Sequence, residues 1–275
     1  MTNTKTIIIR PKKGITWQDF REIWQYRELL YFFTWRDIKV RYKQTVIGIM
    51  WAVFQPFMTM VVFSIFFGHF AKMPSDGVPY PIFVFVGLLL WQFFSSSLNG
   101  ASASLTGNTG IITKVYFPRL ILPISSTLTN FVDFSISLVI LIGIMVYYRF
   151  IPGLAGLWIL PLLLVITFMI AVGAGMFLAS VNVKYRDVRY ALPYFIQMLL
   201  FITPVIYPPS IAGKFSWVLA LNPMTGVIKA ARSAILGNAP INWILLGISA
   251  GFGILVLIIG TVFFKKTERY FADVV

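Results

Sequence analysis

Few side chains in this 275-residue sequence could carry out chemistry, and their scarcity limits the functions open to it. There is no cysteine, and His69 is the single histidine. A thiolate metal site is therefore excluded, and a histidine-based metal cluster or Ser-His-Asp triad nearly so. One carboxylate, Asp133, lies deep within an apolar stretch, where a charge must face protein, water or a partner. Its role is open between hydrogen bonding to a serine or threonine of a neighbouring span and a part in transport.

The sequence also lacks an energy source of its own. Residues 107–114 (GNTGIITK) contain glycines and a lysine, but not at the G-x-x-x-x-G-K-[ST] spacing of a phosphate-binding loop. Ion-coupled carriers bury several ionisable groups in their spans, and here only Asp133 is buried so deeply. A membrane enzyme such as a glycosyltransferase would need paired carboxylates or a metal site. We therefore expect a protein that is not an enzyme and holds no cofactor, driven by ATP and magnesium bound to a partner ATPase.

Six long apolar stretches set the fold class. Hydrophobic residues make up 58% of the chain, and about 20 apolar residues suffice for a helix to cross the hydrocarbon core. The sequence therefore predicts an all-α transmembrane protein. The expected spans are about 46–68, 80–98, 122–147, 155–181, 191–207 and 241–264.

Lysine and arginine are distributed unevenly about these spans. Ten of the 23 precede the first span, and the segments 99–121, 182–190 and 265–275 bring that side to 18, against five on the other side. Because basic residues accumulate on the cytoplasmic side, both termini are expected in the cytoplasm. The same distribution argues against a nucleic-acid partner despite the net charge of +14. We divide the chain into a cytoplasmic segment (1–45), a transmembrane domain (46–264) and a cytoplasmic tail.

An amphipathic helix is expected before the first span. Apolar residues recur there at spacings of three, four and seven, namely Trp17, Phe20, Ile23, Trp24, Leu30 and Tyr31. Charged and polar residues separate them, as on a helix that lies in the membrane interface with its apolar face inward. Trp17, Phe20 and Trp24 are assigned to that face. A helix packed on a soluble surface is the alternative.

Two cytoplasmic loops are candidates for contact with a partner ATPase. The loop 105–121 offers a short helix whose aliphatic and aromatic side chains we expect to be exposed, as a partner groove requires. The loop 182–193 alternates charged residues with tyrosines. An ordinary loop packed on the bundle is the alternative for the first, and a solvated basic loop for the second. The candidate coupling residues are Asn108, Ile111, Ile112, Lys114, Phe117, Lys184, Arg186 and Asp187.

Residues 208–237 are too broken to span the membrane and too apolar for a free loop. Proline and glycine interrupt short apolar runs, a pattern that suits re-entrant or interfacial helices. We predict two such helices, at about 210–221 and 224–235, that dip back from the outer face and form a gate. The residues expected near their turn and the exit path are Leu219, Pro223 and Met224. A static outer cap is the alternative.

Aromatic residues make up 17% of the chain. Many must face lipid or form interfacial belts, but some could offer flat faces on which sugar rings slide along a channel. The candidate channel residues are Trp91, Phe94, Asp133 and Tyr194.

Five stretches carry a family resemblance that covers essentially the whole chain. They are RDIKVRYKQTVIGIMWAVFQP (36–56), ITKVYFPRLILP (112–123), NVKYRDVRYALP (182–193), TPVIYP (203–208) and LNPMTGVI (221–228). In this order they resemble the permease subunits of ABC-2-type polysaccharide exporters (type V exporters). The O-antigen export permeases are the most similar, with capsule and teichoic-acid export permeases nearby.

The resemblance implies a homodimer of six-span permeases that works with two copies of a cytoplasmic ATPase in the bacterial inner membrane. It implies an interface helix at 16–35, a coupling helix at about 108–117 and two gate helices within 208–237. It also implies a lipid-linked substrate, an undecaprenyl-diphosphate O-antigen polysaccharide used in lipopolysaccharide biosynthesis. Export of capsule or teichoic acid is an alternative, as is an ABC-2 exporter of drugs or small lipids with a narrower path.

Overall fold

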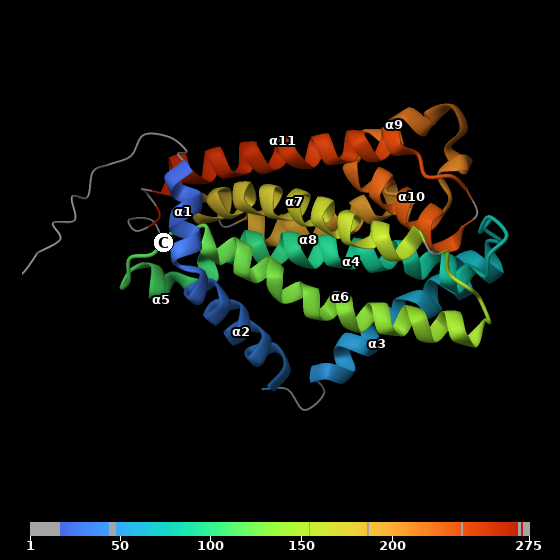
Figure 1. Ribbon diagram of the computed structural model, residues 1–275, viewed down its shortest axis with the longest axis horizontal. Coiled ribbons are helices and arrows are strands. Elements are labelled where there is room, and N and C mark those ends of the chain that lie inside the picture. The colour runs from blue at the N-terminus through green and yellow to red at the C-terminus, as the bar shows by residue number, and fades with distance from the viewer. Residues whose placement is uncertain are drawn as a thin grey trace, which may run out of the picture.

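The computed structural model describes residues 17–43, 48–153, 155–185, 187–237, 239–268 and 271, and the regular structure among them is entirely helical (Figure 1). The N-terminal helices are α1 (Trp17–Gln25), α2 (Arg27–Lys43), α3 (Gly48–Phe63) with its π-helical continuation η1 (Ser64–Phe70), and α4 (Tyr80–Ala103). The middle of the chain forms η2 (Thr106–Asn108), α5 (Thr109–Ile112), α6 (Ile121–Tyr147), α7 (Ala155–Lys184) and α8 (Val188–Ile202). The last elements are η3 (Pro209–Phe215), α9 (Ser216–Ala220), α10 (Pro223–Leu236) and α11 (Trp243–Thr267).

Among the described residues, five helical stretches are long and apolar enough to cross a membrane. They are Met50–Phe70, Tyr80–Ala103, Ile121–Tyr147, Trp158–Lys184 and Trp243–Thr267. These stretches correspond to five of the six spans expected from the sequence. Most of them extend a few residues past the expected C-terminal boundary.

The stretch expected as the fifth span, 191–207, corresponds to α8, which has 15 residues. A helix of that length rises about 22 Å, against ~30 Å of hydrocarbon. The helix ends at Ile202 because Thr203 precedes Pro204, and a proline ring drives the residue before it into an extended conformation. Thr203 has φ −76° and ψ 137°, as this predicts.

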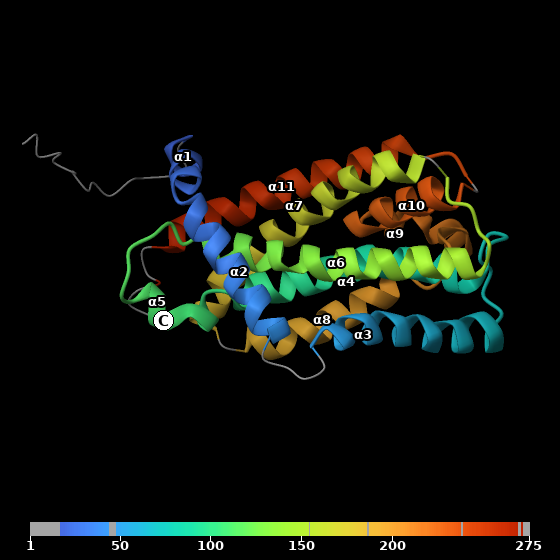
Figure 2. The same cartoon turned by 60° about the horizontal axis from the view of Figure 1, so that its bottom comes forward.

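The α4 helix forms the centre of the bundle. It packs against α3, α6, α7, α8 and α10, and 78% of its most apolar 18-residue stretch is buried within the chain. The helices α3 and α11 lie on the outside of the bundle, where 11% and 22% of the corresponding stretches are buried (Figure 2). Apolar helix surfaces that the chain leaves uncovered must face lipid or a second chain.

Two glycines allow α7 and α11 to approach closely. A Cβ atom on Gly173 would lie 2.6 Å from backbone atoms of Leu257, and one on Gly260 would collide with the carbonyl oxygen of Gly173. Helices in lipid gain little from burying apolar surface against each other, so close backbone packing through small residues stabilises their contact.

The two ends of the bundle are built differently. The helices α1 and α5 and the C-terminal end of α11 lie at one end, and α9 and α10 lie toward the other (Figures 1 and 2). An aromatic cluster occupies the first end, where Phe33, Phe117, Phe264 and Phe271 are each at most 3% exposed. This aromatic cluster joins the N-terminal helices, the loop before α6 and the end of α11 into one packed unit.

Two short helical pieces follow α8, close to the ranges expected from the sequence. The first runs through η3 and α9, and the second is α10. The Asn222 side chain caps α10 by accepting a 3.0 Å hydrogen bond from the backbone N–H of Met224. Pro223 occupies the first turn, and Gly237 ends the helix with φ 70°, a left-handed conformation that favours glycine.

Candidate functional site

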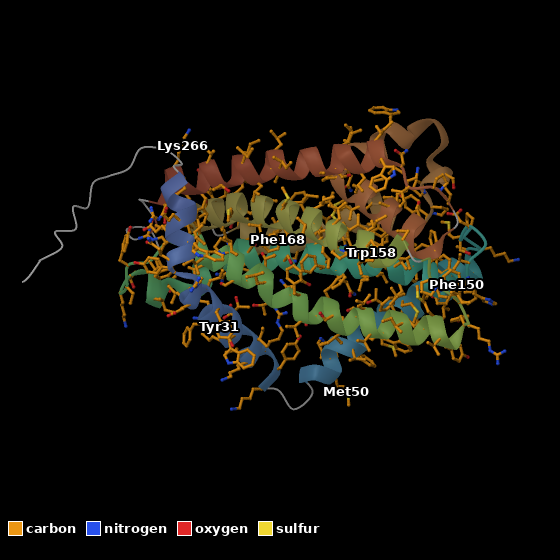
Figure 3. All side chains as sticks on the ribbon, in the orientation of Figure 1. Tyr31, Met50, Phe150, Trp158, Phe168 and Lys266 are labelled. Carbon is orange, nitrogen blue, oxygen red and sulfur yellow. The ribbon has the colours of Figure 1, made fainter. Side chains whose placement is uncertain are left out.

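A cavity of about 550 Å³ lies between α2, α3, α4 and α6. Its walls carry uncharged polar side chains, namely Gln55, Gln92, Ser95, Ser96, Asn130 and Ser137. Trp51, Phe93 and Phe134 supply aromatic faces beside them. Figure 3 labels Tyr31 on α2 and Met50 on α3, the two helices at the edge of the bundle that flank the cavity. Polar groups on membrane-spanning helices normally face protein or a water-filled space, so this cavity is the natural candidate for a polar ligand.

Asp133 of α6 forms the polar centre of this cavity. Its carboxylate accepts hydrogen bonds from the Arg41 guanidinium and from the Tyr42 hydroxyl, both on α2. Arg41 Nη1 also donates to Asn130 Oδ1 at 3.0 Å. The partners of Asp133 are therefore on the helix before the first span, and not the serine or threonine of a neighbouring span that the sequence left open.

Tyr42 acts as a hydrogen-bond donor to Asp133. Burial, and then the hydrogen bond to Asp133, raises the pKa of the Tyr42 phenol well above its ordinary value. The phenol therefore stays protonated at physiological pH and can donate continuously to the carboxylate. Asn130 is held in turn, since its Nδ2 donates to Ser97 Oγ at 3.3 Å and to the Ser126 carbonyl at 3.1 Å.

The cavity offers several kinds of contact to a ligand. Amides and hydroxyls can both donate and accept hydrogen bonds, and the aromatic rings provide apolar contact. These groups suit a hydroxyl-rich ligand. Within the described ranges, no three His, Asp or Glu side chains converge as metal ligands.

Arg36 connects α2 to the loop between α4 and α6. Its Nη2 donates to Asn108 Oδ1 at 2.8 Å and to Asp37 Oδ1 at 2.8 Å. The guanidinium lies 4.8 Å from the centroid of the Phe33 ring, and Phe33 contacts Phe117 with ring centroids 5.6 Å apart. The helix that carries Arg41 and Tyr42 to the cavity is thus also joined to the predicted coupling loop.

The exposure of this loop differs from the sequence expectation. Ile112 and Phe117 are 5% and 3% exposed, because they fill the aromatic cluster around Phe33. The side chains that project from the loop are Val115 and Tyr116, at 58% and 78% exposure. The expectation that Ile112 and Phe117 are exposed on this loop is therefore wrong, while Ile111 is partly buried and Lys114 is exposed. A role of the loop residues in contact with a partner stays a prediction.

The second predicted coupling loop, between α7 and α8, is only partly described. Lys184 is exposed, and its ammonium lies 5.2 Å from the centroid of the Tyr185 ring. Asp187 is also exposed. Arg186, which the sequence assigned to the same surface, lies outside the described residues.

The helices α1 and α2 carry two apolar surfaces. The first, formed by Ile23, Tyr26, Leu29 and Leu30, packs with Phe33 against the aromatic cluster. The expected apolar face is therefore divided, since Ile23 and Leu30 face the protein. The side chains of Trp17 and Phe20, assigned to the membrane-facing side, lie outside the described residues.

The second surface, the aromatic stripe, consists of Trp24, Tyr31 and Trp35, which are 69%, 68% and 45% exposed. Arg27 lies 5.5 Å from the Trp24 ring centroid and Lys39 lies 5.2 Å from that of Trp35. Aromatic rings beside basic side chains are typical of residues at the membrane interface, where the cations meet anionic lipids.

Cysteine labelling can test whether the aromatic stripe lies in the membrane interface. Tyr31→Cys should react with a water-soluble maleimide roughly tenfold more slowly in membranes than Gln25→Cys, which lies off the stripe, because burial of a large side chain in the interface contributes about 1.5–3 kcal/mol. Both positions are exposed in the chain, and no native cysteine interferes. The two rates should become equal in denaturant. Equal rates in intact membranes would show that the stripe does not contact lipid.

The predicted channel and gate residues lie in different environments. Trp91 and Phe94 are 4% and 7% exposed and contact each other in the core of the bundle, with ring centroids 5.4 Å apart. Tyr194, on α8, is 62% exposed. Asp133 is the member of the set that lines the cavity.

The gate residues are mostly turned inward. Leu219 and Met224 are 8% and 1% exposed, because α9 and α10 pack against each other and α10 packs against the bundle. Pro223 is half-buried. That Leu219, Pro223 and Met224 approach an exit path stays a prediction.

Arg232 on α10 is a buried cation, one of the five basic residues that the charge distribution assigns to the side away from the termini. Its side chain donates to the carbonyl oxygens of Pro204 at 2.8 Å and Tyr207 at 3.2 Å, and also to that of Val205. Arg232 lies four residues after Ile228 and three before Ile235, and this position on an apolar helix face is the sequence signal that could have indicated its burial.

Long apolar helices around a polar, aromatic-lined cavity, with a surface loop joined to that cavity through one helix, define a membrane-spanning transport subunit. The chain belongs to the ABC-2 type transporter family, whose family model matches residues 28–236. This match covers every element of the cavity and the helices from α2 to α10.

Curated relatives carry more specific names. The chain is 27% identical over 248 residues to an O-antigen export system permease protein RfbA of Klebsiella pneumoniae, covering 90% of this chain and 95% of the relative. It is 32% identical over 218 residues to RfbA of Myxococcus xanthus, covering 78% and 82%. It is 23% identical over 242 residues to the polysialic acid transport protein KpsM of Escherichia coli, covering 85% and 91%.

Proposed function

We propose that this chain is the permease subunit of an ABC transporter that exports polysaccharide across the bacterial inner membrane. The substrate is an O-antigen linked to undecaprenyl diphosphate. The observation that carries the proposal is the cavity of about 550 Å³, where amides and hydroxyls stand beside Trp51 and Phe93. Sugar rings present hydroxyl edges and apolar faces, and this lining matches both. The names of the relatives from Klebsiella and Myxococcus support the same substrate.

Two copies of the chain form the channel in this proposal. The first span is 11% buried in the single chain, yet it exposes Gln55 as well as Trp51 and Phe57. An amide is costly against lipid tails, so a second copy or a polar path is the better neighbour for this surface. On α8, Tyr194 and Gln197 are also exposed. Because the amide of Gln197 is likewise costly against lipid tails, we expect this surface of α8 to face a second copy or the polar path too.

The membrane topology follows from the distribution of charge. The end that holds α1, α5 and the end of α11 carries most of the basic residues and is cytoplasmic, as are both termini. In this proposal α8 and the turn residues 203–207 together form the fifth of six spans. The pieces η3 with α9 and α10 then re-enter from the outer face as the gate.

A separate ATPase, present in two copies, supplies the energy. It binds ATP and magnesium, and this permease holds neither. The loop 105–121 and the exposed Lys184 and Asp187 are its contact surface. The α2 helix transmits the motion, since Arg36 contacts Asn108 of the loop while Arg41 and Tyr42 contact the cavity.

Capsule export is the second candidate function, supported by the similarity to KpsM. The 32% identity over 218 residues favours O-antigen export over it. A drug or small-lipid exporter shares the fold, but the polar cavity favours a glycan.

Deletion of the gene in its host tests this function. Lipid-linked polysaccharide should accumulate on the cytoplasmic face and disappear from the cell surface, and the wild-type gene should restore it. Inverted vesicles that contain the permease and its ATPase should take up labelled lipid-linked polymer only when ATP is present. Unchanged surface polysaccharide after deletion, with no ATP-dependent uptake by the vesicles, would contradict the proposal.

A further inference from the structure

We propose that the cavity selects uncharged sugar units and rejects anionic ones. This inference rests on the proposed function, since it names the class of glycan that the exporter accepts. Its basis is the charge of the cavity. Arg41 and Asp133 are the charged side chains of its lining, and they form an ion pair with each other. The lining therefore has no net charge to offer a ligand.

Arg41 is committed to its protein partners. Its guanidinium donates to the Asp133 carboxylate and to Asn130 Oδ1 at 3.0 Å. A carboxylate or phosphate on a sugar unit would compete with Asp133 and Asn130 for this guanidinium nitrogen. A neutral sugar unit leaves both contacts intact.

An anionic ligand gains no compensating charge in this cavity. The Arg41 and Asp133 side chains keep 44% and 32% of their accessible surface, so the potentials of the two opposite charges offset each other there. An anion that leaves water without meeting a net opposite charge bears its desolvation cost in full. The remaining lysines of α2, Lys39 and Lys43, do not belong to the lining and cannot balance a second anion there.

The uncharged polar groups of the lining can form hydrogen bonds with the hydroxyl groups of a neutral sugar. Gln55, Gln92 and Asn130 each provide an acceptor and two donors, and Ser95, Ser96 and Ser137 provide hydroxyls. The ring of Trp51 offers an apolar face and is 58% exposed. A neutral sugar unit can exchange its hydrogen bonds to water for these groups without breaking the ion pair.

Binding to the purified permease–ATPase complex in lipid nanodiscs tests the inference. The probes are a neutral mannose trimer and an anionic sialic acid trimer, measured by isothermal titration calorimetry. Wild type should bind the neutral trimer at least roughly tenfold more tightly, because the anion loses its hydration without gaining a net opposite charge in the cavity. Asp133→Asn should improve binding of the anionic trimer by a similar factor, and this gain should weaken as salt is added.

Two further variants separate charge from structure. Arg41→Gln with Asp133→Asn restores an uncharged lining and should return the preference to the neutral trimer. Asp187→Asn removes the same charge from an exposed loop outside the cavity and should change neither affinity. Equal binding of both trimers by wild type, or no anionic gain in Asp133→Asn, would overturn the inference.

The proposed function can fail separately from this inference. Export of both neutral and anionic lipid-linked polymers at equal rates in inverted vesicles would refute the selectivity and leave glycan export intact. Vesicles that export neither polymer, together with a complex that binds neither trimer, would refute both.

Discussion

Replacing Arg232 with methionine is expected to abolish export and to destabilise the folded protein by several kcal/mol. The guanidinium donates to the carbonyls of Pro204, Val205 and Tyr207, which belong to the non-helical turn segment after α8. Each buried carbonyl that loses its donor costs roughly 1–3 kcal/mol. Water cannot replace the donor, because Arg232 is 6% exposed and the segment lies inside the bundle.

The surrounding residues are arranged around this contact. The Arg232 guanidinium lies 3.6 Å from the centroid of the Phe83 ring on α4. A Cβ atom on Gly87 would lie 3.0 Å from Arg232 Nη2 and 3.1 Å from the Val205 carbonyl. The Tyr80 hydroxyl donates to the Ile206 carbonyl at 2.8 Å. Side chains of α10 and α4 therefore hold the non-helical backbone in place from two sides.

Thermal unfolding of the purified protein in detergent and polymer export in vesicles measure the two effects. Arg232→Lys should retain part of both, because an ammonium can still donate but lacks the planar guanidinium fork. Lys229→Met, at a half-buried position one turn earlier on α10, removes the same charge and should leave both near wild type. An Arg232→Met protein that melts and exports like wild type would show that the turn segment 203–207 does not depend on a hydrogen-bond donor from α10.

The helical architecture follows from the sequence because its signals are local. A run such as Tyr80–Ala103 reveals itself by length and apolar character. Proline at position 204 marks the end of α8, although the sequence reading carried the helix to residue 207. The prolines and glycines of 208–237 likewise mark the short helices that follow.

The cavity could not be read from the sequence in the same way. Arg41 and Asp133 are 92 positions apart, and no periodicity links α2 to the middle of α6. The sequence singled out Asp133 correctly as unusual but not its partner. Burial also depends on tertiary packing: the pattern of the loop 105–121 predicts an exposed Ile112, but this side chain is 5% exposed and packs within the aromatic cluster. Arg232 is the opposite case, a charged residue that is buried. Its burial is stabilised by carbonyl groups that precede it by 25 to 28 residues in the sequence.

Replacing Val115 and Tyr116 with aspartate is expected to separate the permease from its ATPase without unfolding it. These side chains project from the loop before α6 at 58% and 78% exposure. The loop is fixed to α2 by Arg36 and Asn108, so force applied to it would reach the cavity helix. Loss of an anchoring contact at a protein interface costs about 2 kcal/mol or more, roughly thirtyfold in affinity. A charge on that surface should cost at least as much.

Copurification of the ATPase with the tagged permease, together with export, reports this loss. Ile112→Asp is the matched contrast, because Ile112 is 5% exposed and a carboxylate there would be buried among Phe33 and Phe117. That variant should lose yield and thermal stability, whereas the Val115→Asp and Tyr116→Asp proteins should keep both and lose only the partner. The exposed side chains would then transmit the ATPase motion while the buried ones hold the loop in shape. If Tyr116→Asp retains the ATPase and exports polymer at the wild-type rate, the coupling surface must lie elsewhere, with the loop that carries Lys184 and Asp187 as the next place to test.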